Sequence, residues 1–245
     1  MLGWSSQRGD ASLPLPGLIR RNATTNGHRF ELGTERMNLN NSANLYSALL
    51  ADVLLDPDDL VSPVETNPIV QAMTGYNHLS YAPTAVDPTF WDPAFLTNIF
   101  RVPDGQPSSV SHASYAHLAL VGGRKQRLWR PSADATVPLI SNRGTYRGQE
   151  SGINYARSFT LLFHPPFDAW SGHVVYGDNH VALESSFAPV GRASSCGGGA
   201  VDNIFRRDCA LGADDDVWLC IGVGATTESQ YTEAPERLVD GTIPQ

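Results

Sequence analysis

The sequence predicts an α+β fold in which one N-terminal amphipathic helix precedes an antiparallel β-sheet of four to five strands with long ordered loops. Three observations support this prediction. Residues 41–55 (NSANLYSALLADVLL) place apolar side chains at helical spacing. The second half of the chain contains several short β-branched or alternating runs that end at turn residues. The 22 glycines and 17 prolines favour short strands and long connections over long helices.

Size and composition predict one globular domain over residues 42–245, preceded by an irregular segment over residues 1–41. A chain of 245 residues of which 41% are hydrophobic can bury a substantial core. The net charge of −8, with Lys125 as the sole lysine, argues against a nucleic-acid partner, because nucleic acids bind clustered positive charge. No apolar run reaches the roughly 18 residues of a membrane span, and the N-terminus lacks a signal-peptide pattern.

The predicted helix has clear start and stop signals. Asn41 or Ser42 can cap its N-terminus, since a side-chain oxygen at that position accepts a hydrogen bond from the first turn. An apolar residue then recurs every four positions, which gives the helix one apolar stripe. The stripe consists of Leu45, Leu49 and Val53. The Asp56-Pro57 dipeptide is expected to end the helix, because the residue before a proline disfavours helical backbone angles.

Five short runs are predicted to form the strands of the sheet. They are residues 111–120, 157–164, 173–176, 180–183 and 216–224. The third and fourth runs, HVVY and HVAL, flank Gly177-Asp178-Asn179, whose residue types accept a positive φ. They are therefore predicted to form a β-hairpin with a three-residue loop.

Polar residues around this hairpin are candidate metal ligands. His164, Asp178 and His180 could bind zinc or another divalent metal if all three converge. The alternative is a turn whose polar residues point to solvent. A second candidate is an acidic turn that could bind calcium through carboxylate oxygens. It consists of Asp214, Asp215 and Asp216. No G-x-S-x-G, H-E-x-x-H, Walker or G-x-G-x-x-G motif occurs, so no enzymatic activity is expected.

Covalent features are confined to cysteines and glycosylation sequons. Cys196 and Cys209 could form a disulfide that closes a glycine-rich loop, while Cys220 lies in an apolar run and is expected in the core. The alternative is that all three cysteines stay reduced. Asn22 and Asn40 begin the sequons NAT and NNS, which are glycosylation acceptors in secreted proteins.

Several segments, taken in order, match the pattern of one family. They are NLYSALLADVLLDPDDLVSPVETNP, YNHLSYAP, PLISNRG, HPPFDAWSGHVVYGDNHVAL and DNIFRRD…ADDDVWLCIG. In the fourth segment His164, Gly172, Asp178 and His180 match the family's histidine-glycine-aspartate-histidine pattern, and Asn179 stands where the family has glycine. Residues 40–225 thus resemble the globular part of type II secretion pseudopilins and type IV pilin-like proteins, especially those of planctomycetes.

This resemblance implies a structural subunit at the cell surface or outside the cell. Such a subunit assembles with copies of itself or with other pilin-like subunits into a filament or tube. The family's apolar N-terminal helix does not occur in this sequence, and Val64 stands where the family often has a cysteine. Either the sequence is a processed or truncated form, or the fold is used without this helix. In the second case polymerisation would use the surfaces of the globular domain alone.

Aromatic residues suggest where such a surface could lie. Residues 60–106 are expected to form a long ordered loop, and its aromatic residues are a candidate assembly surface. These are Tyr76, Tyr81, Phe90, Trp91 and Phe95. The alternative is that this loop covers the core. Two other functions remain open. One is a binding module that stacks Trp91, Trp129 or Trp170 on a glycan. The other is a metal-dependent enzyme at the hairpin.

Overall fold

The central helix, α2, spans Ser42–Ala51 and confirms the predicted helix. In this computed structural model the described residues are 13–24, 27–80, 90–97, 99, 110–189, 201–206, 217–223 and 232–233. The side chain of Asn41 caps α2 by accepting a hydrogen bond of 2.9 Å from the backbone nitrogen of Asn44. The helix ends before the predicted position, because Val53 adopts a left-handed φ of 55° in the turn that follows.

The helix α2 is buried on most of its surface and not along one stripe, so the amphipathic pattern understates its burial. Its buried residues are Ser42, Leu45, Tyr46, Ser47, Ala48, Leu49, Leu50 and Ala51. Its polar side chains bond inside the protein, as the 2.9 Å contact between Ser47 Oγ and Tyr76 Oη shows. Across the described part of the chain, no helix has the length and apolar character needed to cross a membrane.

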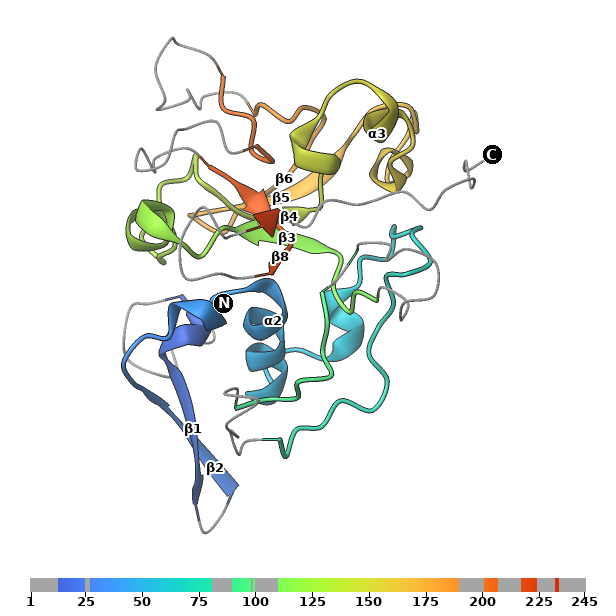
Figure 1. The fold of residues 1–245 in the computed structure, drawn as a ribbon. Helices are drawn as coiled ribbons and strands as arrows, with labels where there is room; N and C mark the ends of the chain where they lie inside the picture. The colour runs from blue at the N-terminus through green and yellow to red at the C-terminus, as the bar shows by residue number, and fades with distance from the viewer. Residues whose placement is uncertain are drawn as a thin grey trace.

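A five-stranded antiparallel sheet lies over α2 (Figure 1), which confirms the predicted α+β fold. Its strand order is β6-β5-β4-β3-β7. The strands are β3 (Tyr115–Leu118), β4 (Pro138–Asn142), β5 (Gly172–Tyr176), β6 (Val181–Glu184) and β7 (Leu219–Cys220). The outer side of β7 is covered, since the backbone nitrogen of Leu219 donates a 2.6 Å hydrogen bond to the carbonyl of Ile204. On the opposite side the described sheet ends at β6.

Within the five-stranded sheet, one predicted strand is wrong and one strand, β4, was not predicted. Residues 157–164 form a 3-10 turn, Phe159–Leu162, after the short helix α3 (Ile153–Ala156). The Ser158 side chain accepts a hydrogen bond from the Thr160 backbone nitrogen, which starts the turn. A short apolar run fits either a strand or a buried turn, and this local hydrogen bond decides between them. The place in the sheet next to β3 is taken by β4, which pairs with both β3 and β5.

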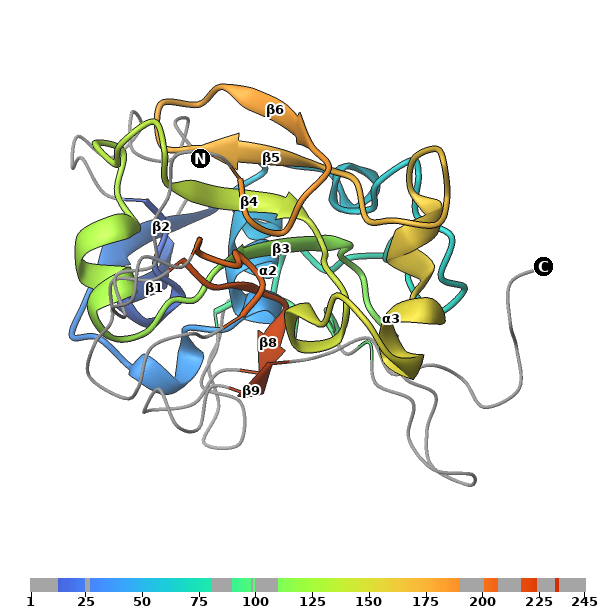
Figure 2. The same ribbon diagram turned by 90° about the horizontal axis from the view of Figure 1, so that it is seen from above.

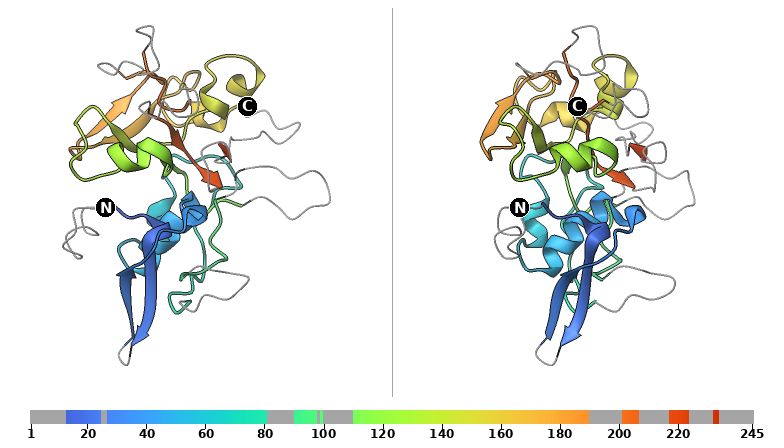
Figure 3. Two further views of the ribbon diagram at one scale, coloured as in Figure 1. Left: turned by 60° about the vertical axis from the view of Figure 1, so that its left-hand side comes forward. Right: turned by 90° about the vertical axis from the view of Figure 1, so that its left-hand side faces the viewer.

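The sequence predicts an irregular segment over residues 1–41, but the structure places a β-hairpin within it. The strands β1 (Ile19–Thr24) and β2 (Gly27–Leu32) pair as an antiparallel hairpin that projects away from the sheet (Figures 1 and 3). Buried Arg21 attaches this hairpin to the body, because its guanidinium donates to the carbonyls of His78 at 2.7 Å and Ala51 at 3.2 Å. Two further short strands, β8 (Gly222–Val223) and β9 (Thr232–Glu233), also pair antiparallel.

Two large apolar cores fill the described structure. In the first, which also includes Leu45 of α2, the rings of Trp170, Phe187 and Phe205 meet edge to face at 5.1 to 5.2 Å. In the second, other side chains of α2 pack against aromatic residues of the loop that follows it. Seen from above (Figure 2), α2 lies beneath β3 and β4, and β5 and β6 extend beyond it.

Candidate functional site

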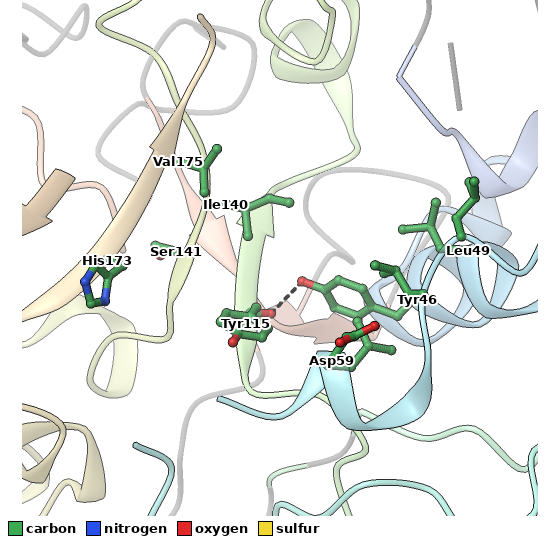
Figure 4. A pocket seen from close by; sticks show the side chains of 11 residues that line it. Tyr46, Leu49, Asp59, Tyr115, Ile140, Ser141, His173 and Val175 are labelled. Carbon is green, nitrogen blue, oxygen red and sulfur yellow. Dashed lines mark hydrogen bonds between the residues drawn. The ribbon is translucent and has the colours of Figure 1, made fainter. Parts of the chain in front are cut away.

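A cavity of about 350 Å³ lies between α2 and the face of the sheet toward α2 (Figure 4). The helix and the segment after it contribute Tyr46, Leu49, Leu54, Leu55, Asp59 and Leu60. The sheet contributes Tyr115, Ile140, Ser141, His173 and Val175. Small-molecule sites in proteins have volumes of roughly 300 to 1,000 Å³ and mostly apolar linings. This cavity therefore has the size and the lining of a small ligand site.

The cavity follows from the difference in width between α2 and the sheet. Neighbouring strands lie about 4.8 Å apart, so a helix with a diameter of about 10 Å covers about two of them. Because α2 lies beneath β3 and β4, it does not cover β5 (Figure 2). The cavity occupies the space beside the helix under β5.

The segment that follows α2 forms the outer wall of this cavity. It ends in a 3-10 turn, Pro57–Leu60, which is held by a capping box between Asp56 and Asp59. The backbone nitrogen of Asp56 donates to Asp59 Oδ2 at 2.9 Å. Between helix and turn, Leu54 and Leu55 stay half-buried, with their side chains on the cavity. The wall is therefore aliphatic and has an ordered support.

Few polar groups face the cavity. The Tyr46 hydroxyl donates a 2.7 Å hydrogen bond to the Tyr115 carbonyl, and burial raises the pKa of Tyr46, so this hydroxyl stays neutral and occupied. The Tyr115 hydroxyl and the His173 imidazole, in contrast, make no hydrogen bond to any residue that the structure describes. Both groups can therefore donate to a ligand.

A second histidine lies behind His173. The rings of His164 and His173 meet edge to face with their centroids 5.2 Å apart. Burial, and then the neighbouring His173, lowers the pKa of His164. His164 therefore stays neutral at physiological pH and supports the His173 ring at one end of the cavity.

The predicted hairpin is present, but the predicted metal triad is not. At its tip His180 Nδ1 lies 2.5 Å from Asp178 Oδ1, and the His180 ring stacks on Tyr176 with centroids 4.4 Å apart. His164 instead contacts His173. Nowhere in the described chain do three His, Cys, Asp or Glu residues gather as metal ligands. The prediction that His164, Asp178 and His180 converge on a metal is therefore wrong.

The hairpin carries an exposed apolar strip at the edge of the sheet, which we call the β6 strip and define as Val181 and Leu183. These side chains are 58% and 57% exposed. Val181 pairs with Val175 and Leu183 with His173, so the strip lies on the same face of the sheet as the cavity. Exposed apolar groups next to an apolar cavity mark this face as the candidate contact surface of the protein.

The three tryptophans proposed to bind a glycan are core residues. Trp91, Trp129 and Trp170 are all almost fully buried. Each indole nitrogen already donates a hydrogen bond, of 2.9 Å to Asn44 Oδ1, 2.9 Å to the Pro14 carbonyl and 3.0 Å to the Arg143 carbonyl, respectively. The prediction that these indoles form a surface platform for stacking on sugars is therefore wrong.

The prediction of an aromatic assembly surface is also wrong for each of its residues that the structure describes. Tyr76, Phe90, Trp91 and Phe95 are buried in the core around α2. The alternative, that this loop covers the core, is confirmed for these four residues. Tyr81 lies outside the described residues.

The remaining candidate sites have mixed outcomes. Cys220 is buried on β7, as predicted. Asn40 is buried, and its amide donates to Glu35 Oε1 at 2.7 Å while its carbonyl accepts from Gly17 at 2.8 Å, so a glycan there would displace both bonds. Asn22 lies on β1, and its side chain is outside the described part. Five other candidates are outside it too: Cys196, Cys209, Asp214, Asp215 and Asp216.

Comparison with protein-family models, with curated proteins and with solved structures gives no match to this chain. The resemblance to pilin-like proteins thus stays a prediction based on the residues that carry it.

Proposed function

We propose that this chain is a structural, non-enzymatic subunit that assembles with copies of itself at the cell surface or outside the cell, as pilin-like subunits do. The observation that carries the proposal is the β6 strip. An exposed apolar strip at the edge of a sheet is a ready surface for a second copy, because it offers both apolar area and backbone groups for strand pairing.

The geometry of β6 favours pairing with another strand. Antiparallel sheets accept a further strand at an open edge, and proteins that stay monomeric protect such edges with lysine, proline or bulges. The four residues of β6, Val-Ala-Leu-Glu, include no lysine and no proline. Within the described chain, no other strand pairs with β6 apart from β5. The edge therefore has little protection against association.

The two exposed side chains supply the apolar part of the contact. Leu183 and Val181 lie two residues apart on one face of β6, so an antiparallel copy of β6 would place them against the same residues of its neighbour. Burial of a leucine or valine side chain that was exposed stabilises by about 1.5 to 3 kcal/mol. Two such residues from each copy support a specific association.

The test is the mass of the protein in solution as a function of its concentration, by light scattering or analytical ultracentrifugation, with electron microscopy of the same samples. Wild type is expected to associate as its concentration rises. Leu183→Lys, which puts a charge into the proposed contact, is expected to stay monomeric.

The matched control is Leu79→Lys, since Leu79 is 75% exposed and lies on a loop away from the strip. It is expected to associate like wild type. A monomeric wild type at every concentration, or equal association of the Leu183→Lys and wild-type proteins, contradicts the proposal.

A further inference from the structure

We propose that the cavity between α2 and β5 binds a medium-chain aliphatic carboxylic acid, with its carboxylate at His173 and its chain along the aliphatic wall. This site is a function beyond assembly, and it does not require that the proposed assembly occurs. Three properties of the cavity carry the proposal: its size, its lining and the position of its polar groups.

The size of the cavity sets the length of the ligand. A protein cavity of about 150 Å³ holds one benzene molecule of six carbon atoms. The cavity here measures about 350 Å³. By the same ratio it holds about ten to fourteen non-hydrogen atoms, which is the size of a ten-carbon fatty acid.

The lining sets the chemistry of the ligand's body. Six aliphatic side chains line the cavity: Leu49, Leu54, Leu55, Leu60, Ile140 and Val175. Leu54, Leu55 and Ile140 stay only half-buried in the protein alone, so a ligand can remove more of their apolar surface from water. Apolar walls on both the helix side and the sheet side fit an aliphatic chain better than a sugar or a nucleotide, whose polar groups would lose their hydrogen bonds to water.

The strand register places the donors for the head group on one face. Tyr115 pairs with Asn142, and Ser141 pairs with Val174, so the side chains of Tyr115 and His173 lie on the same face of the sheet, two strands apart. Both line the cavity. The imidazole and the phenol donate hydrogen bonds, which an anionic carboxylate accepts strongly.

Charge also orients the ligand. Asp59 is the acidic residue of the lining, and it lies on the helix side of Tyr115, away from His173 (Figure 4). A carboxylate head group is repelled at the Asp59 side and accepted at the His173 side, whereas an ammonium head group has the opposite preference. The cavity therefore favours an acid over an amine with the same chain.

The test is calorimetric or NMR titration of the full chain with decanoate below its micelle concentration. Saturable binding at one site is expected for wild type. Leu54→Trp fills the cavity and is expected to weaken binding at least tenfold. Val53→Trp is the matched control, since Val53 is 73% exposed and not part of the lining, and it is expected to keep wild-type binding. Absence of saturable binding, or equal affinity in Leu54→Trp and wild type, overturns the site.

The head-group assignment has its own test. His173→Ala is expected to weaken decanoate at least fivefold and to leave binding of 1-decanol within twofold, and decylamine is expected to bind wild type less tightly than decanoate. Equal decanoate affinity of His173→Ala and wild type, or tighter binding of decylamine, overturns the assignment. If decanoate binds wild type only at concentrations at which the protein is monomeric, a second copy fills the cavity, and the small-molecule occupant is wrong.

Discussion

Arg143 and Glu65 form a buried, two-point ion pair that ties the end of β4 to the loop after α2. Arg143 Nε donates to Glu65 Oε2 at 2.9 Å, and Arg143 Nη2 donates to Oε1 at 2.7 Å. The two side chains are 3% and 2% exposed. Such a pair adds geometric definition as well as energy, because both hydrogen bonds require one relative orientation.

Removal of one partner of this pair should destabilise the protein strongly. Glu65→Gln removes the carboxylate charge that faces the buried Arg143 guanidinium, and the loss of one partner costs about 3 to 5 kcal/mol in other buried pairs. The measurement is the free energy of unfolding from urea or guanidinium titration. Asp58→Asn, at an exposed position in the same region, serves as the control and should change that free energy by less than about 0.5 kcal/mol. Similar values for the two variants would show that the ion pair contributes little.

The buried imidazole of His117 should make stability depend on pH. Its Nδ1 donates to the Leu118 carbonyl at 2.8 Å, so its Nε2 accepts the 2.8 Å hydrogen bond from Ser42 Oγ in the neutral ring. Burial lowers the pKa of His117 from 6.5 to about 4, against a smaller opposite effect of the backbone hydrogen bond.

The sign of this dependence follows from linkage. Since the folded pKa is depressed, the unfolded chain binds the extra proton between pH 6.5 and about 4. The contribution is present in full above pH 6.5 and is lost as the pH falls toward 4, by up to about 3 kcal/mol. Unfolding titrations at several pH values measure this loss. His117→Gln should have a flatter profile over this range, and an unchanged slope would assign the loss to other groups.

Gly177 marks a place where the hairpin meets another backbone segment. A Cβ added at this position would lie 2.5 Å from the Asp134 carbonyl oxygen and 2.6 Å from that of Ala133. Backbone atoms cannot move aside as the end of a flexible side chain can, so Gly177→Ala should destabilise by about 2 kcal/mol or more. Thermal or urea unfolding measures the effect. Ser185→Ala, an exposed change just after β6, is the control, and an equally small effect in both variants would contradict the close packing.

The tip of the hairpin should show a local titration that needs no metal. Hydrogen bonds from the backbone and then the side chain of His180 lower the pKa of Asp178. Carboxyl carbon NMR should therefore find Asp178 titrating below the ordinary range for aspartate. In His180→Ala the side-chain hydrogen bond is gone, and the pKa of Asp178 should rise toward its ordinary value. An unchanged pKa in that variant would assign the shift to the backbone alone.

Local signals in the sequence were enough for the helix and for four of the five predicted strand regions. Asn41 and the leucine spacing located α2, because capping and helical periodicity act over a few residues. Its end was placed too late, since Val53 continues the apolar spacing although it adopts a left-handed conformation. The β1–β2 hairpin was missed, even though Asn26-Gly27 is a strong hairpin signal in sequences.

The cavity could not be predicted in the same way, because its walls come from distant parts of the chain. Leu54 and Val175 are far apart in the sequence, and nothing local to either indicates their contact with one space. One signal was available, however. The run HVVY has consecutive apolar residues, which is typical of a strand that is buried on both faces of its sheet. It therefore indicates an apolar environment on the face that carries Val175 as well as on the face that carries Val174.

Ile204 covers the β7 edge of the sheet, and this limits the number of edges at which another copy can add a strand. In the described sheet β6 alone is open to a partner, so two copies joined there use up both open edges, and continuous strand stacking as in amyloid stops at a pair. Growth beyond a pair would have to alternate two different contacts, one across β6 and one on another surface. The pair joined at β6 would then be the repeating unit, and agents that block β6 would divide a polymer into pairs held by the second contact.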